Sequence, residues 1–177
     1  MTPASEPSAE DRQARFRAVA GHFATGVVIV TGSGPRGPCG LTANAVCSLS
    51  LAPPLLLVCF DNGARTLPVV RDSGRFAVNV LSSDQRDLSL VFASKRSERE
   101  KFAGVGHRLE DGLPIIDGAL AWIVCELERL VEAGDHTIAI GAVGELEGDG
   151  GGDPLIFYRS EYRALRPSAP HLGPAPE

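Results

Sequence analysis

Residues 40–61 contain the side chains with the clearest binding chemistry in this sequence. The first half of this segment carries four short hydrogen-bonding side chains, Thr42, Asn44, Ser48 and Ser50. Successive side chains of a β-strand point to opposite faces, so this spacing predicts hydroxyl and amide groups on one face of an extended segment. A face of this kind either lies in solvent or holds a polar ligand against a sheet, and these residues alone favour neither alternative.

The second half of the segment predicts a buried strand. Residues 55–60 are continuously apolar, and they lie between Pro53-Pro54 and Asp61. A run this short, rich in β-formers and bounded by prolines and an acid, is typical of a strand in the core. The sequence therefore joins a polar face directly to a core strand.

A glycine-rich segment earlier in the chain matches a nucleotide-binding signature without meeting its structural requirements. Residues 32–37 read GSGPRG and fit the G-x-G-x-x-G pattern. The dinucleotide fingerprint needs a helix directly afterwards, whereas Pro38, Cys39 and Gly40 follow here, and Pro35 removes a backbone donor. We therefore predict a hairpin turn and exclude a Rossmann fold.

Histidine and cysteine offer a second set of candidates. Gly134-Asp135-His136 is predicted to form a turn before a strand, where a single histidine is more often a capping or solvent-facing residue than a catalyst. The other histidines have no metal-ligand spacing with each other or with the cysteines, so we expect no metal site. The cysteines are predicted to be reduced thiols, since no C-x-x-C pair links Cys39, Cys47, Cys59 and Cys125.

The elements that position these residues are predicted to be strands joined by turns and short helices. Ser8 and Asp11 predict a capping box at the start of a helix that ends at Gly26. Further short helices are expected over residues 66–71 and 82–93, a loop over 104–112, and a solvated face for the charge run 94–101. Besides residues 40–61, β-rich or alternating runs predict strands at 27–31, 75–81, 119–132, 137–146, 155–158 and 162–165.

This pattern predicts a single, mainly β domain. At least six strands without regular strand–helix alternation exclude a parallel doubly wound sheet. The pattern favours a mainly antiparallel β barrel with peripheral helices. We place the domain at residues 8–166, with a disordered N-terminus at 1–7 and a disordered proline-rich tail at 167–177.

The bulk composition excludes several classes of partner. The 177 residues are 44% hydrophobic and carry a formal charge of −5, which supports neither nucleic acid nor an anionic membrane as a partner. No apolar run is long enough to span a bilayer, and the N-terminus lacks the basic start and apolar core of a signal peptide. We therefore expect a cytoplasmic protein.

Taken in order, several segments resemble the flavin reductase family, the small NAD(P)H:flavin oxidoreductases that supply reduced flavin to two-component monooxygenases. The matching segments lie within residues 23–165 and read FATGVVIVTG, GLTANAVCSLSLAPPLLLVCFD, SGRFAVNVLSSDQ, KFAGV, GALAWIVCELE, AGDHTIAIGAV and PLIFYRSEYRAL. The resemblance implies an FMN-binding split barrel, an antiparallel six-stranded barrel of Greek-key topology that works as a homodimer.

The resemblance also implies the residues of a flavin site. The Gly-Asp-His motif would border the nicotinamide, which gives His136 a catalytic role in orienting that ring. Lys101 would reach a phosphate as a point charge, with Phe102 packing nearby. The full cofactor-binding set is Thr42, Ala43, Asn44, Ala45, Ser48, Leu49, Ser50, Cys59, Asp61, Arg65, Thr66, Asn79, Leu81, Ser82, Lys101, Phe102, Asp135 and His136.

We therefore predict a reductase that transfers a hydride from NAD(P)H to FMN or FAD and supplies the reduced flavin to a partner monooxygenase. NADH is favoured, because the chain has no Rossmann motif with which to read a ribose 2′-phosphate. The transfer needs only the nicotinamide C4 held close to the flavin N5. Two alternatives on the same barrel stay open: an FMN-binding electron-transfer flavoprotein and a non-enzymatic flavin-binding protein.

Overall fold

The computed structural model describes residues 7–148 and 151–165, and within them the protein is mainly β. The expected disorder at 1–7 and 167–177 lies outside these residues, apart from residue 7. The strands fall into one large sheet and two small ones, and every ladder between them is antiparallel. The predicted mainly β, antiparallel architecture with peripheral helices is therefore confirmed.

The large sheet carries the residues that matter most for function. Its seven strands are ordered β3-β2-β6-β9-β10-β5-β4. Their bounds are β2 Val28–Gly34, β3 Gly37–Ala43, β4 Val46–Leu51, β5 Pro54–Asp61, β6 Arg75–Val80, β9 Ala121–Ala133 and β10 His136–Gly148. Within the described ranges no ladder joins the edge strands β3 and β4, so a closed six-stranded barrel is not confirmed.

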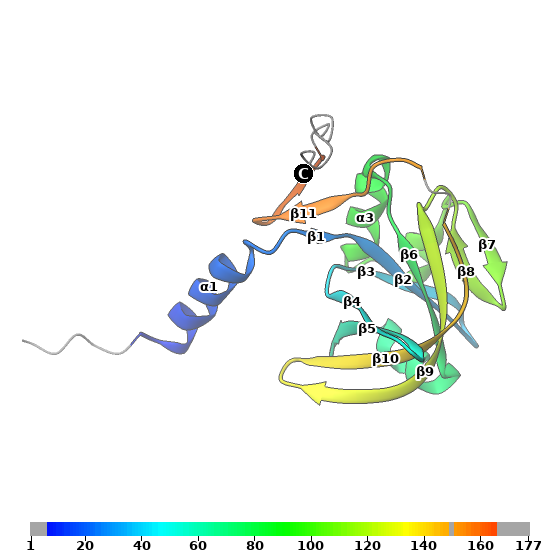
Figure 1. Ribbon diagram of the computed structural model, residues 1–177, viewed down its shortest axis with the longest axis horizontal. Coiled ribbons are helices and arrows are strands. Elements are labelled where there is room, and N and C mark those ends of the chain that lie inside the picture. The colour runs from blue at the N-terminus through cyan, green and yellow to red at the C-terminus, as the bar shows by residue number, and fades with distance from the viewer. Residues whose placement is uncertain (1–6, 149–150, 166–177) are drawn as a thin grey trace, which may run out of the picture.

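Two smaller sheets flank the large one. The first pairs β1 (Thr25–Gly26) with β11 (Ile156–Tyr158) and then β12 (Glu161–Arg163), so it places the strand that follows α1 beside the last strands of the described chain. The second is a hairpin of β7 (His107–Glu110) and β8 (Leu113–Ile116). Figure 1 shows β11 lying beside β1, and α1 (Ala9–Ala20) extending away from the sheets.

The α-helices are short, and the first and the last of those described begin at a serine cap. The Ser8 hydroxyl accepts from the backbone of Asp11, whose carboxylate in turn accepts from Ser8, so the predicted capping box of α1 is confirmed. Ser97 and Glu100 form the same box at the start of α4 (Glu98–Phe102). The remaining helices are α2 (Thr66–Ser73), the short 3₁₀ turn η1 (Ser83–Gln85) and α3 (Arg86–Ala93).

A core of aliphatic and aromatic side chains packs inside the curved large sheet. Phe60 of β5 and Phe76 of β6 meet edge to face with ring centroids 6.4 Å apart. Cys125 is buried beside them, and burial raises the pKa of its thiol to about 12. Burial also raises the pKa of Cys39 to about 11, so both thiols stay protonated and unreactive at neutral pH, as expected for core cysteines.

The glycine-rich segment is a hairpin turn, as predicted. β2 and β3 pair from Val28 and Ala43 at one end to Gly34 and Gly37 at the other. Gly37 takes a φ of 98°, a conformation that glycine adopts without strain. No helix follows the turn, so the segment is not a dinucleotide-binding loop.

Two predicted boundaries are wrong. The first helix ends at Ala20 with Gly21 as its cap, not at Gly26, because residues 25 and 26 pair with β11 instead. Residues 104–112 are not all loop, since His107–Glu110 forms β7 against the buried strand β8. The turn between β7 and β8 is held by Arg75, whose guanidinium donates to the Asp111 carbonyl and carboxylate.

Candidate functional site

A cavity of about 560 Å³ lies where β3, β5 and β10 meet the helices α2, α3 and α4. Its volume falls in the range of small-molecule and cofactor sites, roughly 300–1,000 Å³. Its walls combine apolar side chains, hydroxyl and amide groups, and cations. The lining residues are Leu41, Thr42, Ala43, Asn44, Ala45, Cys59, Asp61, Gly63, Ala64, Arg65, Thr66, Phe92, Ala93, Ser94, Lys95, Lys101 and His136.

More than half of the predicted cofactor-binding residues line this one cavity. Residues 42–45 come from the end of β3 and the turn after it, and Cys59 and Asp61 come from β5. His136 begins β10 and pairs with Asp61 across the β5–β10 ladder, which brings two residues distant in sequence to one wall. The other predicted residues gathered here are Arg65, Thr66 and Lys101.

A second group of predicted residues does not line the cavity. Residues 48–50 lie on the edge strand β4, where Ser48 and Leu49 are exposed. Leu81 and Phe102 are buried in an apolar cluster, and Ser82 is the N-cap of η1 and bridges to Pro154.

Asn79 is fully buried and its amide joins three strands. Its Nδ2 donates to the Ile29 carbonyl at 3.1 Å and to the Thr31 hydroxyl at 3.3 Å. Its Oδ1 accepts from the Ile116 backbone at 2.8 Å. The side chain therefore connects β6 to β2 and β8, and it uses its hydrogen-bonding capacity inside the core.

Thr42 and Asn44 already have protein partners within the site. The Thr42 hydroxyl donates to the Ser89 carbonyl at 2.6 Å, and the Ser89 hydroxyl contacts the Tyr162 hydroxyl. This chain of contacts ties the cavity wall through α3 to β12. The exposed Asn44 amide makes one bond, from Nδ2 to the Thr25 hydroxyl at 3.2 Å, so its oxygen is available to a ligand.

His136 and Asp135 form a hydrogen-bonded pair at the cavity. The His136 Nδ1 lies 2.7 Å from the Asp135 Oδ1, and the His136 side chain is 43% exposed. This hydrogen bond and, after it, the electrostatic interaction with His136 lower the pKa of the Asp135 carboxyl. Asp135 lies outside the cavity lining, so it fixes the orientation of the ring from behind and leaves Nε2 for a ligand.

The turn that carries Asp61 is built by its own side chain. The Asp61 Oδ1 accepts from the Gly63 backbone at 2.7 Å, a local turn that brings Gly63, Ala64 and Arg65 to the cavity. Asn62 fixes the same turn to β10, since its Oδ1 accepts from the Thr137 hydroxyl at 2.7 Å.

Some cavity residues had no clear sequence signal. Leu41 and Phe92 give the apolar wall, yet each falls in a stretch where core packing explains an apolar residue equally well. Ser94 and Lys95 belong to the charge run that was expected to be a solvated face. In the structure Lys95 is exposed, as that expectation requires, yet it also lines the cavity; the expectation fails for Lys101 of the same run, which is buried.

The parts of the chain that the structure describes show no group of three His, Cys, Asp or Glu side chains able to hold a metal ion. The same residues contain no helix long and apolar enough to cross a membrane.

The fold and cavity define an antiparallel β protein with a cavity lined by both apolar and polar groups. Residues 20–166 match the Flavin reductase like domain family, and the chain belongs to that family. The chain is 44% identical over 149 residues to the flavin reductase of Pseudomonas putida, an alignment that covers 83% of this chain and 86% of that protein. It is 40% identical over 155 residues to the reductase subunit HsaB of a flavin-dependent monooxygenase from Mycobacterium tuberculosis, covering 86% and 82%.

Solved structures are similar over nearly the whole chain. The crystal structure of a nitrilotriacetate monooxygenase component B homologue from Mycobacterium thermoresistibile superposes with a TM-score of 0.86, at 39% identity and 90% coverage of each chain. The NADH:FAD oxidoreductase of Streptomyces globisporus in complex with NAD and FAD fragments gives a TM-score of 0.85, at 35% identity, covering 94% of this chain and 99% of that one.

Proposed function

We propose that this protein is an NAD(P)H-dependent flavin reductase whose reduced flavin serves a partner monooxygenase. The observation that carries the proposal is the cavity itself, which joins an apolar wall to hydroxyl, amide and cationic groups on one continuous surface. The relatives support it, since they include flavin reductases and a reductase subunit of a flavin-dependent monooxygenase.

The lining residues fit a flavin. The isoalloxazine ring system is planar and largely apolar, and Leu41 and Phe92 offer it an apolar surface. The Asn44 amide and the backbone groups of residues 42–45 can meet its polar edge, and cations beside Ser94 can meet its phosphate. A bound flavin supplies the chemistry by accepting a hydride from the nicotinamide C4 at its own N5.

The protein contributes position rather than acid–base chemistry. His136 is held by Asp135 at the cavity rim, where its free ring nitrogen can orient the nicotinamide amide over the flavin. The buried cysteines take no part, since their thiols are protonated and face the core. Names of other relatives, an FMN reductase (NADH) and an NADH-dependent flavin reductase, support NADH as the donor.

The test is the loss of NADH absorbance with purified protein under air, with FMN, with FAD and without added flavin. We expect NADH oxidation that depends on added flavin, and the flavin with the higher kcat/KM is the preferred one. Oxidation without added flavin indicates a tightly bound cofactor. Flavin binding without oxidation of either NADH or NADPH contradicts the proposal and leaves a flavin-binding protein.

Three further proposals concern the whole molecule. We propose that residues 8–166 form one split-barrel domain. The edge strand β3 lies close to β5, which is near the opposite edge of the large sheet, so the sheet curves back on itself. We propose a homodimer, because α1 buries none of its side chains and leaves Phe16 and Val19 exposed. Leu51, on the edge strand β4, is exposed as well. We propose a cytoplasmic location, because all four cysteines are free thiols. Light scattering of the purified protein tests the dimer.

A further inference from the structure

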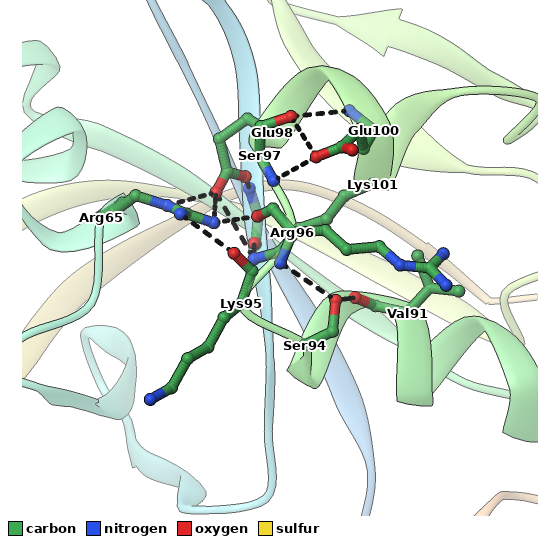
Figure 2. A network of polar contacts seen from close by, with 10 residues as sticks. Arg65, Val91, Ser94, Lys95, Arg96, Ser97, Glu98, Glu100 and Lys101 are labelled. Carbon is green, nitrogen blue, oxygen red and sulfur yellow. Dashed lines mark hydrogen bonds and ion pairs between the residues drawn. The ribbon is translucent and has the colours of Figure 1, made fainter.

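Three cations line the cavity, and a flavin phosphate needs one of them. They are Arg65 before α2, Lys95 in the segment between α3 and α4, and Lys101 on α4. A cation can bind a phosphate only with donors that the protein has not already used. The contacts of the three side chains therefore decide between them, and Figure 2 shows these contacts.

Lys101 is held inside the protein. Its side chain is 6% exposed, and its Nζ donates to the Gly40 carbonyl at 2.9 Å and lies 3.4 Å from the Glu98 Oε1. The other carboxylate oxygen of Glu98 accepts from the Gly40 backbone N–H at 2.9 Å. Lys101 and Glu98 thus clamp one residue of β3 from both sides, and the charge of Lys101 is already compensated.

Arg65 is held by the same carboxylate. Its Nε donates to the Glu98 Oε1 at 3.1 Å, and its Nη2 lies 3.0 Å from that oxygen. The Nη1 donates to the Lys95 carbonyl at 3.4 Å, and Nη2 donates to the Arg96 carbonyl. The guanidinium therefore ties the segment between α3 and α4 to α2, and all three of its nitrogens already donate to protein acceptors.

Lys95 is different from both. Its backbone carbonyl is fixed by Arg65, but its ammonium has no hydrogen-bond or ion-pair partner among residues 7–148 and 151–165. The side chain is exposed and lines the cavity, and in Figure 2 it extends away from the network that surrounds Glu98. It is the cation of the three whose donors are available.

We propose that Lys95 is the residue that binds the phosphate of the flavin, and that Glu98 is the positioning residue that holds Lys95 in place through Arg65. This inference rests on the proposed function. It moves the phosphate contact from Lys101, the residue that the sequence predicts for it, to a residue that no sequence pattern singles out. Glu98 acts on the phosphate only indirectly, by occupying Arg65 and Lys101 and by fixing the backbone that carries Lys95.

The test compares FMN with riboflavin, which lacks the phosphate, by titration of flavin fluorescence without any nicotinamide. We expect Lys95→Met to weaken FMN binding about tenfold, the size of one charge-assisted contact, with riboflavin binding unchanged. Arg99→Met is the matched control, because Arg99 is exposed on α4 and lies outside the cavity lining. The proposal is overturned if Lys101→Met selectively weakens FMN binding and Lys95→Met does not.

The positioning role of Glu98 has its own test. Glu98→Gln keeps the size of the side chain. Glu100→Gln makes the same charge change on the same helix, at a residue whose side chain hydrogen-bonds only to Ser97 among the described residues. We expect Glu98→Gln to lower the preference for FMN over riboflavin, and to have no such effect when Lys95 is already Met. If Glu98→Gln lowers the preference for FMN equally with Lys95 present and with Lys95→Met, the coupling between Glu98 and Lys95 is refuted. Wild-type protein that binds neither flavin refutes the proposed function instead.

Discussion

Replacing Asn79 with leucine separates a structural role from a binding role. Leucine has nearly the shape of asparagine but neither donates nor accepts hydrogen bonds, so the Ile116 N–H and the Ile29 carbonyl lose their side-chain partner in the core. An unsatisfied buried group costs about 1–3 kcal/mol. The sum for two groups, less the gain from burying an apolar side chain, gives a loss of about 3 kcal/mol in the free energy of unfolding.

The assay is chemical and thermal unfolding of the variant, followed by flavin titration at a temperature where it is folded. A loss of about 3 kcal/mol lowers the Tm of a chain of this size by roughly 6–12 °C. Flavin affinity is expected to stay within about twofold of wild type, because Asn79 does not line the cavity.

Asn44→Ala is the matched comparison. Asn44 is exposed at the cavity and makes a single hydrogen bond, to Thr25, so its removal is expected to change stability by less than about 1 kcal/mol and to weaken flavin binding. If Asn79→Leu leaves stability unchanged and weakens flavin binding, the assignment of Asn79 to the core is refuted, and the sequence-based placement in the flavin site is right.

Three other perturbations test the site. Iodoacetamide at mildly alkaline pH is expected to alkylate Cys59, which lines the cavity, more slowly when FMN is present, whereas the exposed Cys47 reacts at the same rate with and without FMN. Peptide mass spectrometry measures the labelling. Equal labelling of Cys59 with and without FMN contradicts the placement of the flavin. Gly40→Ala puts a Cβ 2.8 Å from the Phe92 ring and is expected to destabilise the protein by about 1–3 kcal/mol in urea unfolding. Gly26→Ala adds a Cβ with no atom within 4 Å, so its free energy of unfolding is expected to change little. Equal effects of the two substitutions refute the close packing at Gly40. His136→Ala is expected to lower kcat for NADH about tenfold with the flavin Kd unchanged, and a change in Kd alone argues against a nicotinamide role.

Local chemistry explains what the sequence predicts well about the fold. The Ser8 cap and the glycine hairpin each depend on a few neighbouring residues, and both are present. β7 was missed because its residues carry no strong strand pattern. It forms because the buried strand β8 offers it a partner, and such a tertiary influence is not visible in a short window of sequence.

The site likewise has residues that the sequence reveals and residues that only the tertiary structure reveals. Residues 42–45 and His136 were found because their motifs resemble those of the family. Lys95 was not found, because a lysine in a charge run is usually solvated and only the fold shows that Lys101, six residues further on, is buried. Residue type shows which side chains are cations, but the contacts of Glu98 decide which of these cations is free to bind a ligand.

The isolated position of α1 has a consequence for hydrogen exchange. The helix spans 12 residues and buries none of them, and helices of this length are only marginally stable in water without a packing partner. If a second copy of the chain covers Phe16 and Val19, the backbone amides of α1 gain protection as protein concentration rises, while those of β5 and β6 do not change. The exchange rate of this one helix then reports the monomer–dimer equilibrium directly, without an attached probe or a substitution.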